Sequence, residues 1–254
     1  ALSDYLTFRY IPGKSTLIKN IYKLPPSSML TYSDGSISIK KYHEFKLNIE
    51  NKSESYFIDK IRNTLESSIK SQMVADVPIG VYLSGGIDSS TNVAIMSKFV
   101  NEPLKTFSIG FELYNQDVSS YFNETEYAKL VSEKYNTDHS EIIVSQDILK
   151  ILPEVVAHLD NPIAFETAMP LYYLSKQARK KVKVILTGDG GDEMFLGYHR
   201  YYDMLLRKKL RNFLPFKSIV RNITASSKLA KSLNYLAIDD NSSYLKGFST
   251  FKLE

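Results

Sequence analysis

No cysteine occurs among the 254 residues of the chain. This absence excludes disulfides, thiolate metal sites and a cysteine nucleophile within the sequence. The chain also lacks any run of about 18 apolar residues, the length that a membrane-spanning helix needs, so we expect no membrane span. The formal net charge is only +4, which does not by itself indicate a nucleic-acid partner.

The N-terminus lacks the basic and apolar segments of a secretory signal, and the sequence begins with alanine instead of methionine. We therefore expect a cytoplasmic protein, and we expect this sequence to be a processed chain or a piece of a longer one. Hydrophobic residues make up 43% of the chain, which is enough for one large domain with appendages.

Hydrophobic patterning predicts strands that alternate with helices. The predicted helices lie at 54–75, 89–100, 124–135, 146–159 and 167–181, and the predicted strands at 77–83, 104–111, 141–144 and 182–186. Pro153 predicts a break within the fourth helix. This alternation is typical of an α/β fold, in which helices flank a parallel sheet. Ligands of such folds bind beyond the C-terminal ends of the strands, near a switch in strand order.

Three segments are expected along the chain. Residues 1–50 form an interdomain segment with a β-hairpin that turns at Asp34-Gly35, residues 51–202 form the α/β core, and residues 203–254 form a helical, truncated extension. A polar loop is expected over residues 112–123.

The stretch 77–91 carries the first chemical signal, a buried strand followed by a glycine turn and a helix. Gly85 and Gly86 let the backbone approach a ligand closely, and the helix N-terminus offers unpaired N–H groups to a phosphate. Asp88 supplies a carboxylate that could hold Mg²⁺ against phosphate oxygens. Because no lysine follows Gly86, the turn is not the common nucleotide P-loop.

A second loop, Thr187–Glu193, follows the last predicted strand. Three of its seven residues are glycine and three are acidic. Carboxylates so close together repel one another unless a cation or ligand compensates, although a flexible acidic turn that caps a helix is the structural alternative. Both loops are expected at equivalent ends of one sheet, where Asp88 and Asp192 could share one Mg²⁺ bound to a polyphosphate.

These loops resemble known sequences. The stretch Ser84–Ser89 resembles the pyrophosphate loop of the N-type ATP pyrophosphatases, and residues 187–201 resemble the signature of glutamine-hydrolysing asparagine synthetases. Shorter similar stretches support the second likeness at 5–13, 23–26, 106–111, 125–128 and 137–141. The resemblance implies an ATP-pyrophosphatase core of the adenine nucleotide α-hydrolase (HUP) type.

The resemblance also implies an activity. Such enzymes adenylylate a carboxylate, favoured here to be aspartate, with ATP and Mg²⁺, and ammonia then displaces AMP to form an amide. The implied ATP and pyrophosphate contacts are Leu83, Ser84, Gly85, Gly86, Asp88, Ser89, Ile109, Thr187 and Gly188. Asp88 and Asp192 would bind the metal, and Asp189 would lie beside the acyl-adenylate and assist ammonia attack.

The sequence departs from the family pattern in three respects. Thr187 replaces the usual serine, and Asn161 replaces a glutamate in a stretch, 160–167, that bears on the acceptor pocket. The family's glutaminase domain with its cysteine nucleophile is missing, and the family chain extends further at its C-terminus. We therefore expect a fragment that is inactive by itself in the glutamine-dependent reaction and that belongs with a glutaminase domain in its parent chain.

Several alternatives stay open at this point. The acceptor could be a sugar uronic acid or a carboxylated β-amino acid that closes to a β-lactam. The domain could instead bind ATP without turnover. RNA modification is a third class, but thiolation commonly needs cysteine and the basic stretch near Arg207 is modest, so no nucleic-acid partner is expected. The oligomeric state is open, with a homodimer as one option.

Overall fold

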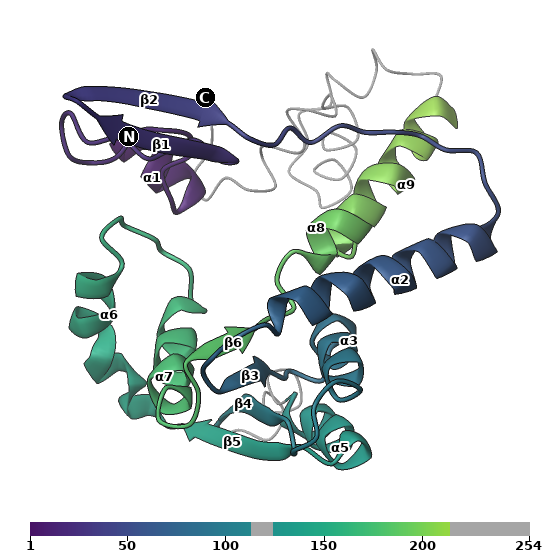
Figure 1. The fold of residues 1–254 in the computed structure, drawn as a ribbon. Helices are drawn as coiled ribbons and strands as arrows, with labels where there is room; N and C mark the ends of the chain where they lie inside the picture. The colour runs from purple at the N-terminus through teal and green to yellow at the C-terminus, as the bar shows by residue number, and fades with distance from the viewer. Residues whose placement is uncertain (113–123, 214–254) are drawn as a thin grey trace, which may run out of the picture. The chain divides into compact units, whose positions relative to one another are not determined.

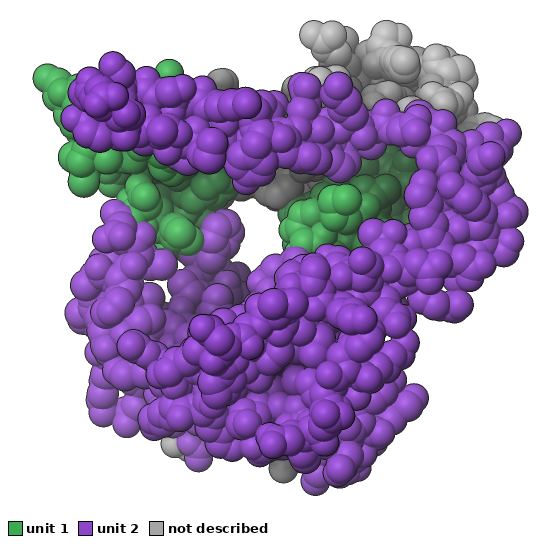
Figure 2. All heavy atoms as spheres, in the orientation of Figure 1, with its two compact units in different colours: residues 1–23, 161–164, 190–254 green, residues 24–160, 165–189 purple. Residues whose placement is uncertain are grey.

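The computed structural model describes residues 1–112 and 124–213 (Figure 1). All but the first residue of the predicted loop 112–123, and most of the predicted extension 203–254, lie outside the described residues. The chain divides into two compact units, shown in different colours in Figure 2. Unit 1 takes residues 1–23, 161–164 and 190–254, and unit 2 takes residues 24–160 and 165–189.

Unit 2 contains a parallel four-stranded sheet. Its strands are β3 (Ile79–Tyr82), β4 (Lys105–Phe111), β5 (Asp138–Val144) and β6 (Val184–Leu186), in the order β5-β4-β3-β6. The chain passes from β3 to β4 to β5 on one side and then returns to β6 on the other side of β3. The strand order therefore switches between β3 and β6, which is where ligands of such sheets bind.

Helices cover both faces of this sheet (Figure 1). They are α2 (Glu54–Gln72), α3 (Ile87–Met96), α5 (Thr125–Tyr135) and α7 (Ala168–Ala178). Side chains of α2, α3 and α5 pack with buried Val81 and Leu83 on one face. Side chains of α7 pack with buried Phe107 on the other face, where Tyr82 also lies. Successive residues of β3 thus serve opposite faces, as a central strand requires, and the predicted α/β class is confirmed.

The N-terminal hairpin of unit 2 is also confirmed. Strands β1 (Ser28–Ser33) and β2 (Ser36–Lys41) pair antiparallel, with Ser33 opposite Ser36. The two residues between them, Asp34 and Gly35, have φ angles of 50° and 77°. Positive φ at both central positions is the geometry of a type I′ turn, which matches the twist of the two strands.

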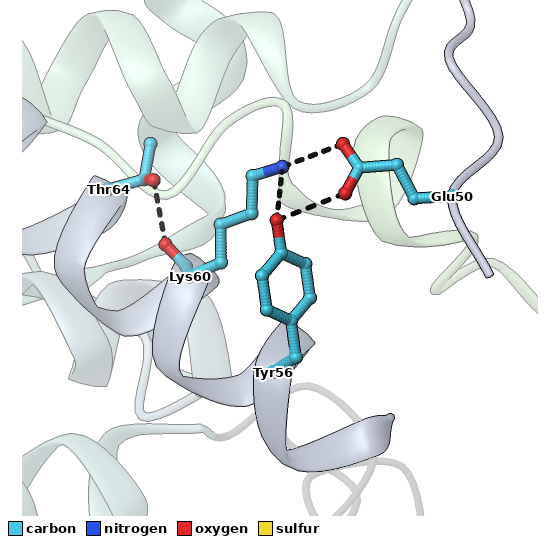
Figure 3. A network of polar contacts seen from close by, with 4 residues as sticks. All are labelled: Glu50, Tyr56, Lys60 and Thr64. Atoms are coloured by element: carbon cyan, nitrogen blue, oxygen red, sulfur yellow. Dashed lines mark hydrogen bonds and ion pairs between the residues drawn. The ribbon is translucent and has the colours of Figure 1, made fainter. Parts of the chain in front are cut away.

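The connection before α2 is fastened to that helix by a polar network (Figure 3). Tyr56 Oη donates to Glu50 Oε2 and Lys60 Nζ donates to Glu50 Oε1, each at 3.0 Å. Ser53 caps the helix by accepting a hydrogen bond from the Tyr56 backbone N–H at 3.3 Å. The Lys60 hydrogen bond is the main reason why the pKa of Glu50 lies below its usual value. Ser53 therefore marks the start of α2, and the Glu50 contacts hold the preceding connection against the helix.

The predicted break at Pro153 is confirmed. A 3₁₀-helix, Gln146–Ile151, precedes α6 (Leu152–His158), and Pro153 lies in the first turn of α6. Strand β5 differs from the prediction, because it begins at Asp138 instead of Glu141. The first residues of β5 are polar, so hydrophobic patterning does not predict a strand there. The ring of His139 meets hydroxyls of β4, which is why a polar residue fits within the sheet.

Unit 1 contains α1 (Leu2–Phe8), α8 (Gly191–Phe195) and α9 (His199–Phe213). The left-handed residue Arg9 ends α1, and its carbonyl accepts a hydrogen bond from the Ala164 N–H at 2.9 Å. This bond joins residues 161–164 to the N-terminal segment. Among the helices that the structure describes, each is too short or too polar to cross a membrane.

Candidate active site

The turn that follows β3 has the geometry that the sequence predicts for a glycine turn. Leu83 is 1% exposed, and its N–H still donates to Phe107 O at 2.8 Å, so the sheet pairing reaches the edge of the turn. Gly85 has a φ of +83°, and a Cβ added there would lie 2.4 Å from Tyr127 Cβ. Both the backbone conformation and the close approach of α5 therefore require glycine.

Serine hydroxyls hold the turn from within. Ser89 Oγ donates to Gly86 O at 3.2 Å and lies 3.0 Å from Ser84 Oγ. The Ser84 backbone N–H donates to Ser89 Oγ at 3.2 Å. Ser89 is 6% exposed, whereas Ser84 is exposed. Ser89 thus shapes the turn from a buried position, whereas the Ser84 side chain stays exposed.

Helix α3 begins at the end of this turn. Gly86 is its N-cap and provides no side-chain hydrogen bond to the first turn. The N–H groups of that turn, together with the helix dipole, favour an anion at this point. Asp88 lies half-buried in the same turn. The local structure therefore combines anion-binding N–H groups with one carboxylate that could hold a cation.

The second loop leaves β6 directly beside the first. Leu186 pairs with Val81 of β3, so the two strands end at the same edge of the sheet. A Cβ on Gly188 would lie 2.9 Å from Asp88 Cβ. Asn92 Nδ2 of α3 also donates to Thr187 O at 2.7 Å. The structure thus brings Thr187 and Gly188 against the Ser84–Ser89 turn, as the sequence predicts for the two loops.

The other predicted site residues are more widely spread. Ile109 lies half-buried on β4 and packs with the Phe107 cluster, and Asp189 is exposed at the end of unit 2. Asp192 lies in the first turn of α8, in unit 1. A Cβ on Gly197 would lie 1.9 Å from Asp192 Oδ1, so Gly197 leaves room for that carboxylate. The shared metal site of Asp88 and Asp192 stays a prediction.

A cluster in unit 1 was not predicted as a site. Tyr198 Oη donates to Glu193 Oε1 at 2.6 Å, and this bond raises the pKa of Tyr198 to about 12. The guanidinium carbon of Arg200 lies 4.1 Å from the centre of the Tyr198 ring. These contacts join α8 to α9 across Leu196, which has a φ of 59°. The sequence shows the residues but not their pairing, which depends on the turn at Leu196.

Asp88 is a candidate ligand for magnesium. Within residues 1–112 and 124–213, no group of three or more histidine and acidic side chains gathers to form a metal site. Magnesium commonly uses one or two carboxylates and takes its other ligands from phosphates and water. Asp88, which lies in the first turn of α3, fits that pattern.

An open parallel sheet with two glycine loops at its switch point defines a doubly wound α/β ligand-binding domain. Comparison with known proteins narrows this class. The family model for asparagine synthase matches residues 60–249, and the chain belongs to this family. The resemblance seen in the sequence is therefore confirmed.

Two relatives show how much of the family protein is present. The chain is 36% identical over 221 residues to asparagine synthetase [glutamine-hydrolyzing] 1 of Bacillus subtilis, covering 86% of this chain and 33% of the relative. It is 33% identical over 246 residues to a putative asparagine synthetase of Methanocaldococcus jannaschii, covering 93% and 45%. The chain therefore spans less than half the length of these relatives.

Among solved structures, an ammonia-dependent NAD synthetase from Campylobacter jejuni matches with 13% identity and a TM-score of 0.35. That match covers 80% of this chain and 100% of the synthetase. The assignment to the asparagine synthase family therefore rests on the family model and the sequence relatives, and not on this structure.

Proposed function

We propose that the chain is the ATP-dependent part of an asparagine synthetase-type ligase. It activates the side-chain carboxylate of aspartate with ATP, and ammonia then converts the activated group to an amide. Family membership supports this proposal. The main structural support for the proposal is the contact of Gly188 with Asp88, because this contact joins the two glycine loops at the switch point.

In the first step, a carboxylate oxygen of aspartate attacks the α-phosphorus of ATP, the bond to the β-phosphate breaks, and pyrophosphate leaves. The Ser84–Ser89 turn would bind the pyrophosphate, with Gly85 and Gly86 allowing close approach. The exposed Ser84 hydroxyl would turn away from Ser89 to donate a hydrogen bond to the pyrophosphate. Negative charge grows on the leaving group, so fixed N–H groups at the start of α3 stabilise the transition state.

In the second step, ammonia attacks the acyl carbon, the bond to AMP breaks, and one proton is lost. Asp189, exposed at the end of the second loop, would accept that proton. The backbone at Leu83, Ile109, Thr187 and Gly188 would contact the adenosine. Asp88 and Asp192 would hold Mg²⁺, which would supply positive charge to offset the negative charge of the phosphates.

The curated relatives are named as glutamine-hydrolysing enzymes. We therefore propose that a glutaminase domain in the same parent protein supplies the ammonia. A cytoplasmic location fits this chemistry, since ATP is consumed. A homodimer is one possible assembly and does not enter the mechanism.

The proposal is tested with the full-length protein by exchange of labelled pyrophosphate into ATP. The exchange should require aspartate and magnesium, and Asp88→Ala or Asp192→Ala should lower it at least about 100-fold. The control is Asp59→Ala, which removes an exposed carboxylate of α2 that pairs with Arg62 at 3.5 Å. Exchange that survives both site substitutions would contradict the two-loop site.

One departure from the family pattern favours a carboxylic acid other than aspartate as the substrate. Asn161 stands where the family commonly has glutamate, beside the unusual stretch 165–167. A uronic acid or a carboxylated β-amino acid would then replace aspartate in the same chemistry. AMP release measured with each acid separates these acceptors, whereas binding of Mg-ATP without AMP release from any of them would indicate a non-catalytic module.

A further inference from the structure

Asn92 lies on α3, one helical turn beyond Asp88, and the sequence gives no reason to assign it to the site. Its side-chain Nδ2 donates a hydrogen bond of 2.7 Å to the backbone carbonyl of Thr187. The bond joins the helix that follows the first loop to the first residue of the second loop. Both residues belong to unit 2, so the contact lies within one compact unit.

This bond fixes one end of the second loop, and packing fixes the next residue. A Cβ on Gly188 would meet Asp88 Cβ at 2.9 Å and the Ser89 backbone N at 3.0 Å. Thr187 is therefore tied to α3 by its carbonyl, while Gly188 rests against the first turn of the same helix. Together these contacts set the distance between the two loops.

Thr91, the residue before Asn92, forms its hydrogen bond within α3 instead of to the second loop. Thr91 Oγ1 donates at 2.7 Å to Ile87 O, a carbonyl of its own helix. Such a bond satisfies the hydroxyl without leaving α3. Thr91 therefore provides a matched position on the same helix that does not touch the second loop.

We propose that Asn92 is a positioning residue for the nucleotide, because its amide holds the Thr187–Gly188 backbone at a fixed distance from the Ser84–Ser89 turn. This inference rests on the proposed function, in which the turn binds phosphates and the second loop contacts adenosine. A nucleotide must touch both loops at once. A shift of the second loop therefore weakens binding even when every contacting residue is intact.

The test measures binding of α,β-methylene-ATP with Mg²⁺ to the full-length protein by calorimetry. This analogue cannot be cleaved between its α- and β-phosphates, so binding is read without reaction. Asn92→Leu keeps the size of the side chain and removes the donor, and it should weaken binding about tenfold. The KM for ATP should rise by a similar factor, whereas Thr91→Ala should leave both values unchanged.

Stability is measured on the same variants, because a merely structural bond would lower the melting temperature without changing nucleotide affinity at 25 °C. That result overturns the inference. Asn92→Ser also removes the amide, and its shorter side chain cannot reach the Thr187 carbonyl. If Asn92→Leu fails to fold, Asn92→Ser serves in its place and should show the same loss of binding. If the unchanged protein does not bind the analogue, the proposed function fails. If it binds and both variants bind equally well, only the role of Asn92 fails.

Discussion

Gly188 and Asp88 lie so close that a single added Cβ on Gly188 would come within 2.9 Å of Asp88 Cβ. The neighbours on the Asp88 side also include the backbone N of Ser89 at 3.0 Å, which cannot rotate away as a flexible side chain can. The two loops are therefore in contact through backbone and Cβ atoms. This contact is what makes them one candidate site.

Gly188→Ala should separate the two loops. The added methyl group forces either the second loop or the start of α3 to move, and a displacement of about 1 Å can cost about 100-fold in rate. Pyrophosphate exchange by the full-length protein should fall by about that factor, while circular dichroism stays unchanged. The control is Gly35→Ala in the hairpin turn, where φ is +77° and nothing lies within 4 Å of an added Cβ; it should not affect exchange. Equal exchange in wild type and Gly188→Ala would contradict the importance of the contact.

Gly85→Ala should act on stability. The residue has a φ of +83°, and a Cβ would lie 2.4 Å from Tyr127 Cβ and 2.7 Å from the Ala128 backbone N. Left-handed strain and overpacking each cost about 1–3 kcal/mol, so urea denaturation should show a loss of at least about 2 kcal/mol. A loss below about 0.5 kcal/mol would show that the turn relaxes easily.

Gly86→Ala is the matched comparison for that variant. Gly86 has an ordinary φ of −65°, and its nearest neighbour to an added Cβ is Ser84 Oγ at 3.3 Å. The fold should tolerate the methyl group with little loss of stability. Because the group would occupy the approach to the proposed phosphate site, pyrophosphate exchange should fall instead. Unchanged exchange in this variant would contradict that placement of the phosphate.

Regular patterning explains why most of the fold of unit 2 could be predicted. The strand at Val81 is apolar, and Leu65, Ile69 and Met73 recur every four residues and pack in the same cluster, so tertiary packing agrees with local preference there. The start of β5 could not be predicted, because its polar His139 depends on hydroxyls of a different strand. Asn92 was missed for the same reason, since its partner lies 95 residues away.

His139 should make stability depend on pH. Its ring nitrogens lie 2.9 Å from Thr106 Oγ1 and 3.1 Å from Ser108 Oγ, and burial lowers its pKa from the ordinary 6.5 against the opposing charges of Glu141 and Asp138. The unfolded chain therefore binds a proton more readily than the folded chain. The contribution of the neutral ring is present above pH 6.5 and is lost as pH falls through the lowered pKa.

Urea denaturation between pH 7.5 and pH 5 tests this dependence. Wild type should lose more stability over that range than His139→Gln, by an amount no larger than one additional proton bound by the unfolded chain explains. Substitution of the exposed His43 by glutamine is the control and should leave the pH dependence of wild type unchanged. Identical curves for wild type and His139→Gln would contradict the role of burial.

Tyr198 and Glu193 should titrate as a pair. The 2.6 Å hydrogen bond to Glu193 raises the pKa of Tyr198 to about 12, and the same bond is the main reason that the pKa of Glu193 is lowered. Carbon NMR of protein labelled at the tyrosine ring should show one tyrosine, absent from Tyr198→Phe, that ionises near the raised value. Glu193→Gln removes the negative acceptor, so that resonance should titrate closer to the usual 10.0.

Tyr202, exposed on α9, provides the comparison through Tyr202→Phe, which should leave the raised titration in place. A raised pKa of Tyr198 that persists in Glu193→Gln would mean that the Glu193 carboxylate is not its cause.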